Sequence, residues 1–428
     1  MGDCEERPYE NSWIKKDSVM VQTIPQRYYY LDYMRGCLLL ILAIDHSGHA
    51  YAQTWGRLHF LEDFDRSVVF DVVYMFSNSM VMPGLFFLAG LFTTISLEKH
   101  GVVGFFKRRF IRLGLPFILG IPLLGPLLVY PSNVLAEGLH YSLGEYITHY
   151  YFNNDLSVSG PFWVLYAIFL YAGIAALLYS LVPPFRSLLR WGGATIIRFP
   201  LRSAICIIIL SAFILTLSDY YWSAIYWIKL WWIFGIQGGR FLFLILYFFI
   251  GLMLGTQLEN FQKNLVENYR RYWAVAVMVM VVLGIFYIGY SLIYVDDGAY
   301  NSEIRRFLKT EGNLLDAWPL IKEYGGAIAI RTSLHACFCF FQIASLLLIF
   351  SHKTDSEQTF WSSWSTYAYL VFLFHELPVL WLQYGMLGMD IPILVKVSIN
   401  FCLGVLGTWG VLKIVVKETR IQRKTVFS

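Results

Sequence analysis

Charged residues are scarce in this chain. Asp, Glu, Lys and Arg make up only 14% of its 428 residues, whereas 57% are hydrophobic. Apolar runs near twenty residues recur along the whole sequence, and soluble domains seldom contain such runs. The sequence therefore predicts an all-α fold, a polytopic transmembrane helix bundle.

Cysteine pairs and the common cofactor motifs are missing. The six cysteines lie scattered, without the CxxC spacing of zinc or redox sites, so we expect neither a disulfide framework nor a metal site. The sequence has no Walker loop, Rossmann fingerprint or HExxH motif, and we expect no permanently bound cofactor. The net charge of +4 reflects loop bias, so we expect no nucleic-acid partner.

Ten apolar windows predict about 10 membrane spans, and an eleventh is possible. The windows are 31–53, 68–96, 110–130, 161–182, 203–218, 238–257, 272–294, 326–350, 367–388 and 391–412. The eleventh candidate, 220–237, carries Lys229 and many Trp and Tyr residues, a composition typical of the membrane interface. We expect it to be an interfacial or re-entrant piece.

The positive-inside rule favours ten spans over eleven. With ten spans and a cytoplasmic amino terminus, most of the 33 Lys and Arg residues lie on the cytoplasmic side. An eleventh span would move the basic tail "KIVVKETRIQRK" to the outside. We therefore expect both termini to be cytoplasmic.

The chain is expected to hold one membrane domain between two tails. The first 26 residues lack an apolar core and a small-residue cleavage site, so a cleavable signal peptide is not expected. We interpret 1–26 as a cytoplasmic N-terminal tail, 27–416 as the transmembrane domain and 417–428 as a cytoplasmic basic tail. The expected location is the plasma (inner) membrane, as a multi-pass protein surrounded by membrane lipids.

The first span carries five ionisable side chains: Asp32, Arg35, Asp45, His46 and His49. A charge in mid-membrane costs about 2.5–3.5 kcal/mol on insertion scales, so such residues need partners or a watery cavity. Arg35 and His46 are separated by roughly 16 Å of helical rise, within about 20° of three whole turns. Both side chains therefore share one face. Asp32 precedes Arg35 by three residues and Asp45 precedes His49 by four, spacings at which helical side chains meet.

Two interpretations of this span are open. Arg35 could extend to the membrane boundary while the histidines are ordinary hydrogen-bonded bundle residues. Alternatively, the group is a functional site, because imidazole suits proton transfer near neutral pH and ionisable residues inside membranes are usually functional. The combined spacing favours the functional interpretation.

The motif "RGCLLLILAIDH", an Arg and a His separated by ten residues, resembles the pattern of the membrane acyltransferase family 3. Arg109 and Arg112 supply an Arg-x-x-Arg motif that is similar to that of the family. The resemblance continues in "MPGLFFLAGLF" (82–92), "FFKRRFIRLGLPFILGIPLL" (105–124), "GPFWVLYAIFLY" (160–171) and "STYAYLVFLFHELPVL" (365–380). The order and intervals resemble the glucan biosynthesis protein C branch.

One element departs from the family pattern. Members usually have Ser before Gly in the "FFxxSGF" element, and this chain has Ala89 before Gly90. The change removes a hydroxyl, so we assign that position no hydrogen-bonding role. No His is followed five positions later by Asp, so the HxxxxD arrangement of many soluble acyltransferases is missing.

The resemblance implies acyl transfer from cytoplasmic acyl-CoA, acetyl-CoA or succinyl-CoA, to a hydroxyl of a glycan or other carbohydrate acceptor at the outer face. Coenzyme A carries a pyrophosphate and a 3'-phosphate, to which clustered basic side chains offer charge-assisted contacts. Positive-inside anchoring is the structural alternative for this cluster. The expected donor-binding residues are Arg35, Lys107, Arg108, Arg109 and Arg112.

His46 is the expected catalytic residue. An acceptor hydroxyl must lose its proton as it attacks a thioester, and a positioned imidazole base contributes about 10²–10⁴-fold. A covalent acyl-imidazole intermediate is the alternative route, and the sequence does not separate the two. The supporting or cavity-lining residues are expected to be Asp32, Asp45, His49, Asp71, Arg331, His335, His375 and Glu376. The polar segments 131–160 and 295–325 could cradle a sugar.

A proton-coupled secondary transporter or flippase is the main rival, because buried Arg, Asp and His residues also serve transport. The two halves of the sequence show no internal repeat and no matching pair of Gly/Pro-broken spans, which argues against it. A non-catalytic scaffold would leave the register of Arg35 and His46 unexplained.

Overall fold

The computed structural model describes most of the chain. The described residues are 28–54, 61–136, 138, 140–152, 160–222, 227–231, 234–294, 318–351 and 360–418. The expected tail 1–26 and nearly all of the expected tail 417–428 lie outside them. The same holds for 295–317 and 153–159, parts of the two polar segments expected to cradle a sugar.

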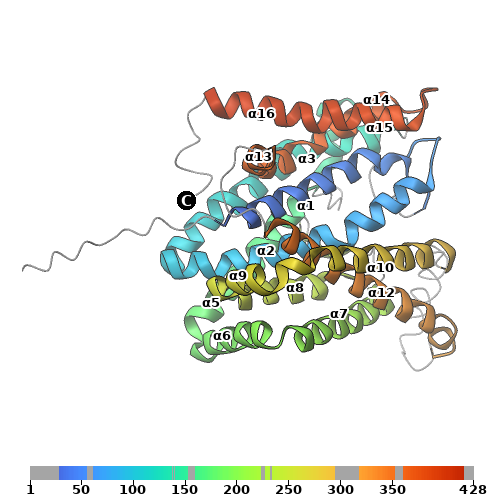
Figure 1. Cartoon of the computed structure of the whole chain (residues 1–428). Coiled ribbons are helices and arrows are strands. Elements are labelled where there is room, and N and C mark those ends of the chain that lie inside the picture. The colour runs from blue at the N-terminus through green and yellow to red at the C-terminus, as the bar shows by residue number, and fades with distance from the viewer. Residues whose placement is uncertain are drawn as a thin grey trace, which may run out of the picture.

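Helices make up nearly all of the described structure (Figure 1). They are α1 (Tyr29–Gly48), α2 (Val68–Arg109), α3 (Leu115–Tyr130), α4 (Leu143–Glu145), α5 (Phe162–Leu181), α6 (Pro183–Arg198), α7 (Pro200–Trp222), α8 (Phe241–Gly255), α9 (Leu258–Asn264), α10 (Trp273–Tyr294), α12 (Trp318–Phe350), α13 (Phe360–Phe374), α14 (Glu376–Gly385), α15 (Ile393–Ile399) and α16 (Gly407–Glu418). Short 3-10 or π turns are η1 (His49–Tyr51), η2 (Phe110–Gly114), η3 (Pro131–Ala136), η4 (Tyr146–Tyr151), η5 (Leu265–Tyr269), η6 (Arg270–Tyr272) and η7 (Asn400–Leu406).

The predicted helix bundle is confirmed. Among the described residues, six helical stretches are long and apolar enough to cross a membrane, and α8 is a shorter apolar helix. Each of the ten predicted windows overlaps at least one helix, and several extend a few residues beyond the helix end. The total of ten spans and the cytoplasmic side of the termini stay predictions, because length and apolarity alone do not place a membrane.

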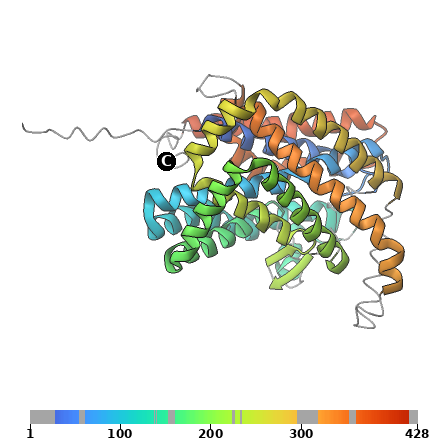
Figure 2. The same cartoon turned by 60° about the horizontal axis from the view of Figure 1, so that its bottom comes forward.

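The segment 220–237 departs from the all-α expectation. After α7 ends, β1 (Trp227–Trp231) and β2 (Phe234–Gln237) form an antiparallel pair in whose backbone register Ile228 is opposite Ile236. Aromatic and β-branched side chains favour strands, which explains why this stretch does not continue the helix. Figure 2 brings this strand pair forward, beside the end of α7. The described part of this segment therefore forms no eleventh spanning helix.

Helix α2 reverses direction at Gly101. This glycine has a φ of 65°, a conformation that a side chain rarely adopts. The guanidinium of Arg109 donates to the hydroxyl of Thr93 at 3.1 Å, although these residues would lie about 24 Å apart along a straight helix. The chain thus runs from 68 to 100 and then folds back along itself before it enters α3.

The layers of the bundle are joined by helices that lie far apart in the sequence. The helices α13, α14, α15 and α16 lie along one side, with α1 and α3 next to them, and α6 and α7 lie on the opposite side (Figure 1).

Between these two sides, α2 packs on α8 through glycines. A Cβ added at Gly90 would collide with the carbonyl oxygen of Phe248, and one at Gly251 would collide with that of Phe87. Small residues allow such close approach of membrane helices.

The Gly90→Ala exchange is expected to lower stability. The new methyl group would force the α2 and α8 backbones apart, and overpacking of this kind costs about 1–3 kcal/mol. The apparent melting temperature of the purified protein in detergent should fall by several degrees. Gly289→Ala is the matched control, because a Cβ added there meets nothing within 4 Å. Equal melting temperatures for the two variants would contradict the role of Gly90.

Candidate active site

The centre of the candidate site is a contact between two histidines. His46 Nδ1 lies 3.2 Å from His375 Nε2, and the rings stack with centroids 5.2 Å apart and an interplanar angle of 14°. His46 comes from the last turn of α1. His375 stands at the junction of α13 and α14, where Pro378 cannot offer an N–H to the carbonyl of Phe374. This break in the helix ladder places an imidazole beside α1.

The hydrogen-bond partners of His375 decide which nitrogens carry protons. His375 Nδ1 lies 2.9 Å from the carbonyl oxygen of Val371 and 3.2 Å from that of Phe372. A carbonyl only accepts, so Nδ1 of His375 carries the proton and Nε2 of the neutral ring is an acceptor. His46 therefore donates from its Nδ1, and its lone pair resides on Nε2. The backbone of α13 thereby fixes the tautomer that a general base needs.

A second imidazole lies next to this pair. His49 Nε2 is 3.5 Å from Asp45 Oδ1, and both side chains are buried. The His49 ring lies 5.3 Å from that of His46 and 5.4 Å from that of Tyr74 on α2, measured between ring centroids. The ionisable groups near the carboxyl-terminal end of α1 are thus gathered at one point of the bundle.

Two amide side chains from the last helices hold the end of α1. Gln383 on α14 donates from Nε2 to the carbonyl oxygen of His46 at 2.9 Å, and Asn400 in η7 donates to that of Ser47 at 3.4 Å. The last carbonyls of a helix have no partner within it, so these amides supply the missing donors. They fix the position of His46 from the backbone side.

The segment that follows α1 is fixed by buried carboxylates. Lys396 on α15, with no exposed surface, pairs with Asp63 at 2.9 Å. The carboxylate of Asp71 accepts from the backbone N–H groups of Gln53 and Thr54, each at 2.9 Å. Asp71, expected from the sequence to be a supporting or cavity-lining residue, orders the turn that follows His49 through these bonds.

Arg331 and His335 belong to a neighbouring polar group. Arg331 on α12 forms a buried ion pair with Asp219 on α7, and Arg240 donates to Asn78. The ring of His335 stacks on that of Tyr287 on α10, with ring centroids 5.0 Å apart. These residues line a cavity of about 20 Å³, which has room for about one water molecule.

Tyr74 joins this cavity to the histidines. Its side chain lines the cavity, and its ring neighbours that of His49. The carboxylate of Glu376, in contrast, points away from the cavity, toward the start of α5. Its Oε2 would lie 3.5 Å from a Cβ added at Gly160, two residues before α5 begins. Polar side chains therefore continue from the His46–His375 pair across the bundle toward α7 and α12.

Most of the expected donor-binding residues lie at the end of the bundle opposite the His46–His375 pair. This region is named the basic end, and it consists of Arg35, Arg108, Arg109 and Arg112. Arg35 pairs with Asp32 at 3.1 Å. The charge of Arg112 interacts with those of Arg35 and Arg108, and the charge of Arg109 interacts with that of Arg112. Lys107, in the same run, has an exposed side chain.

Helix α13 connects the basic end with the histidine pair. The indole of Trp364 donates to the carbonyl oxygen of Gly36 on α1 at 2.8 Å. The hydroxyl of Tyr369, further along α13, donates to the carbonyl oxygen of Arg112. His375 follows Tyr369 by six residues, or roughly 9 Å of helical rise. Arg35 and His46 on α1 therefore both lie along α13.

Several residues of the site are not in the set expected from the sequence: Tyr74, Asn78, Asp219, Arg240, Gln383, Lys396 and Asn400. Asp219 and Arg240 stand at the edges of apolar windows, where a charged residue is indistinguishable from a loop residue. Lys396 stands inside the window 391–412, and a lysine within an apolar stretch is a signal that identifies a buried pair.

A helical membrane bundle with buried imidazoles on one side and clustered guanidinium groups on the other has the parts of a group-transfer enzyme. The family model of the acyltransferase 3 domain, described as an acyltransferase domain, matches residues 28–414. The chain belongs to this family, and it is a multi-pass membrane acyltransferase. No curated protein and no solved structure matches it.

The exchange His375→Phe is expected to lower kcat about 10–100-fold, the loss typical of removing an orienting partner. Phenylalanine keeps the stacked ring but cannot accept from His46 Nδ1. His375→Gln, whose amide oxygen can accept this bond, should restore part of the rate. KM for the acyl donor should not change in either variant.

The control for this test is His149→Phe, which changes an exposed histidine in η4 that is not part of the pair. Its kcat should equal that of the wild type. An unchanged kcat in His375→Phe, or no difference between the Phe and Gln variants, would exclude His375 as a positioning residue.

Proposed function

We propose that this acyltransferase moves an acetyl or succinyl group from cytoplasmic acyl-CoA to a hydroxyl of a glycan or other carbohydrate acceptor at the outer face of the plasma (inner) membrane. The observation that carries the proposal is the fixed tautomer of His46, imposed by His375 and the carbonyls of α13. An imidazole with a preset lone pair is the group that acyl transfer to a hydroxyl requires.

In the base-catalysed route, His46 Nε2 takes the hydroxyl proton as the acceptor oxygen attacks the thioester carbonyl. The C–S bond then breaks, and the proton passes from the imidazole to the thiolate of coenzyme A. In the covalent route, Nε2 itself attacks the thioester carbonyl, the C–S bond breaks and coenzyme A leaves as its thiolate. The acceptor oxygen then attacks the acyl-imidazole, the C–N bond breaks, and the hydroxyl proton passes through the freed Nε2 to the thiolate. Both routes use the same nitrogen, and His375 orients it in both.

The basic end is proposed to bind the phosphate groups of the donor. Guanidinium groups make bidentate, charge-assisted hydrogen bonds to phosphate oxygens. Arg109 is already held by Thr93, and Asp32 already neutralises part of the charge of Arg35. The charge of Arg112 interacts with those of both Arg35 and Arg108, so a phosphate bound there would offset the repulsion among three guanidinium groups. Arg112 is therefore the proposed principal phosphate ligand.

The acceptor is proposed to approach from the opposite end, near His49 and Tyr74. The polar groups of Asn78, Asp219 and Arg240 lie behind Tyr74 and suit a ligand with many hydroxyl groups. A carbohydrate provides such groups, and the likeness to the glucan biosynthesis protein C branch points to a glucan or related glycan. The cavity itself holds about one water molecule, so we assign it to the support of the acceptor rather than to its full enclosure.

His46→Ala should abolish acyl transfer while the protein remains folded in the membrane. The methyl group can neither accept the hydroxyl proton nor form an acyl-imidazole. Labelled acyl-CoA incubated with purified wild-type protein and a glycan acceptor should lose its thioester, and the variant should not. A pure transporter or a scaffold would show no thioester loss with either protein. Retention of more than a few per cent of activity would remove His46 from the mechanism.

Arg112→Met should raise KM for acyl-CoA about tenfold, because a hydrogen bond to a charged group contributes about 1.5–3 kcal/mol. KM for the acceptor should stay the same. Arg186→Met is a control at another helix, since this guanidinium contacts Tyr179. An equal effect of both substitutions on KM for acyl-CoA would indicate a general charge effect and would return Arg112 to membrane anchoring.

A further inference from the structure

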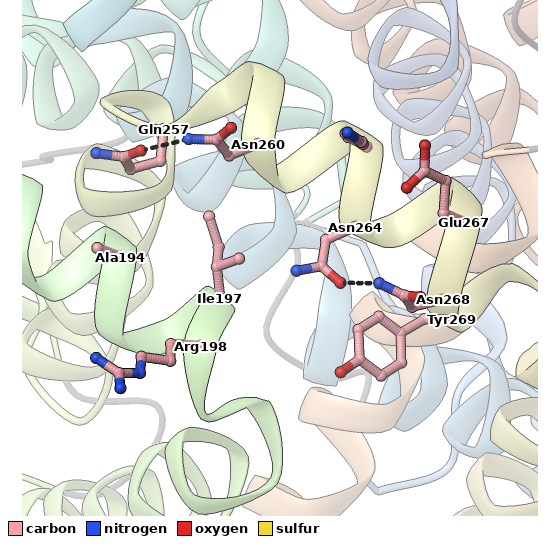
Figure 3. Close-up of a pocket in the computed structure, with 10 residues that line it drawn as sticks. Ala194, Ile197, Arg198, Gln257, Asn260, Asn264, Glu267, Asn268 and Tyr269 are labelled. Atoms are coloured by element: carbon pink, nitrogen blue, oxygen red, sulfur yellow. Dashed lines mark hydrogen bonds between the residues drawn. The ribbon is translucent and has the colours of Figure 1, made fainter.

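A polar cleft of about 550 Å³ lies between the end of α6 and the run formed by α9 and η5 (Figure 3). It is separate from the histidine site and from the cavity beside Tyr74. Four of its lining side chains are carboxamides: Gln257, Asn260, Asn264 and Asn268. They recur at intervals of three or four residues, so they share one face of this helical run.

The carboxamides form two pairs. Asn260 Nδ2 donates to Gln257 Oε1 at 2.9 Å, and Asn268 Nδ2 donates to Asn264 Oδ1 at 2.6 Å (Figure 3). Each bond uses one donor and one acceptor, so each pair retains an amide N–H on one residue and a carbonyl oxygen on the other. An amide bonds the edge of adenine through such a donor and acceptor, as Asn and Gln do with N6 and N7.

Charged and aromatic groups complete the lining. Arg198 ends α6, and Lys263 lies on α9; both side chains are exposed and can bind phosphate. Tyr269 ends η5 and offers a ring face on which a base can stack, a contact worth about 1–3 kcal/mol per base. Glu267 also lines the cleft, where its carboxylate can accept from ribose hydroxyls. The lining thus matches each part of a phosphorylated adenosine.

The cleft adjoins the basic end through the seam of α2 and α8. A Cβ added at Gly193 on α6 would lie 3.2 Å from Cγ of Gln257, and one added at Gly255 would collide with the hydroxyl of Thr94. The residue before Thr94 is Thr93, which accepts the hydrogen bond from Arg109. The cleft and Arg109 are therefore on neighbouring sides of one helix pair.

A second contact leads from the cleft to α1. The charge of Glu259 on α9 interacts with Tyr28, directly before α1 begins. Coenzyme A has its adenosine 3'-phosphate at one end, its thioester at the other and a pyrophosphate between them. A donor whose pyrophosphate lies at the basic end can extend its adenosine toward the cleft.

We propose that the cleft between α6 and α9–η5 binds the adenosine 3'-phosphate end of acyl-CoA. The inference rests on the proposed acyl-CoA donor and names the part of the chain that recognises the nucleotide. The carboxamide pairs contact the base, Tyr269 stacks on it, and Arg198 and Lys263 bind the 3'-phosphate.

The test measures binding of adenosine 3',5'-bisphosphate to the full-length protein in nanodiscs by isothermal titration calorimetry. Asn264→Leu removes one carboxamide pair, and Arg198→Met removes one cation. Each should raise Kd tenfold or more. Arg202→Met is the matched control, because Arg198 and Arg202 both contact the ring of Phe199 but only Arg198 lines the cleft. Its Kd should stay within twofold of the wild type.

Kinetics give an independent measurement. Asn264→Leu should raise KM for acyl-CoA about tenfold but leave KM for an acyl N-acetylcysteamine thioester unchanged, because that short donor has no nucleotide. Equal effects on both donors would overturn the proposal, since they would indicate a general disturbance of the site.

The outcomes separate this inference from the proposed function. Thioester loss without binding of adenosine 3',5'-bisphosphate, or with binding that neither cleft variant weakens, would overturn the cleft assignment and leave the transfer reaction standing. Nucleotide binding that the cleft variants weaken, without thioester loss, would support the nucleotide site and contradict the transfer reaction. Displacement of the nucleotide by phosphatidylglycerol in the nanodisc, with equal affinity for inorganic phosphate, would show a phosphate site for lipid headgroups and overturn recognition of adenosine.

Discussion

The hydrogen bond between His46 and His375 is the contact on which the rest of the site depends. It joins residues that are 329 positions apart and so ties the first helix to the junction of α13 and α14. A polar side chain in hydrocarbon is stable only with a partner, so the pair fixes how α1 and α13 lie against each other. The same helices carry Arg35 and Tyr369 toward the basic end. One contact thereby sets both the tautomer of His46 and the alignment of the two ends of the site.

Other buried polar side chains of the bundle are likewise stabilised by a partner from another part of the chain. Lys396 with Asp63, Arg331 with Asp219, and Gln383 with the carbonyl of His46 each join helices from distant parts of the chain. Removing one partner of a buried ion pair leaves an uncompensated charge and costs about 3–5 kcal/mol, so these pairs select one arrangement of helices. The apolar seam of α2 and α8 relies on glycine instead, because lipid does not drive two apolar helices together.

Hydropathy predicted the helices well because apolarity over twenty residues is a local property. The spacing of Asp32, Arg35, Asp45, His46 and His49 likewise predicted their mutual contacts, since an α-helix fixes the separation of its own residues. The same reasoning does not predict that His46 contacts His375. His375 was recognised as an intramembrane ionisable residue, but no local pattern states which helix it contacts. The reversal at Gly101 and the pairing of β1 with β2 depend on tertiary packing and were not predicted.

The identity of the orienting partner constrains the chemistry of His46. In a triad with a carboxylate, the negative charge stabilises the imidazolium that forms. Here the partner is a neutral imidazole whose other nitrogen faces backbone carbonyls, and the nearby carboxylate of Asp45 is next to His49. A long-lived imidazolium would be costly in this buried position, because charge in the membrane needs a direct counter-ion. The arrangement therefore favours proton transfer that keeps pace with attack on the thioester and with departure of the thiolate, so that the charge on His46 is brief.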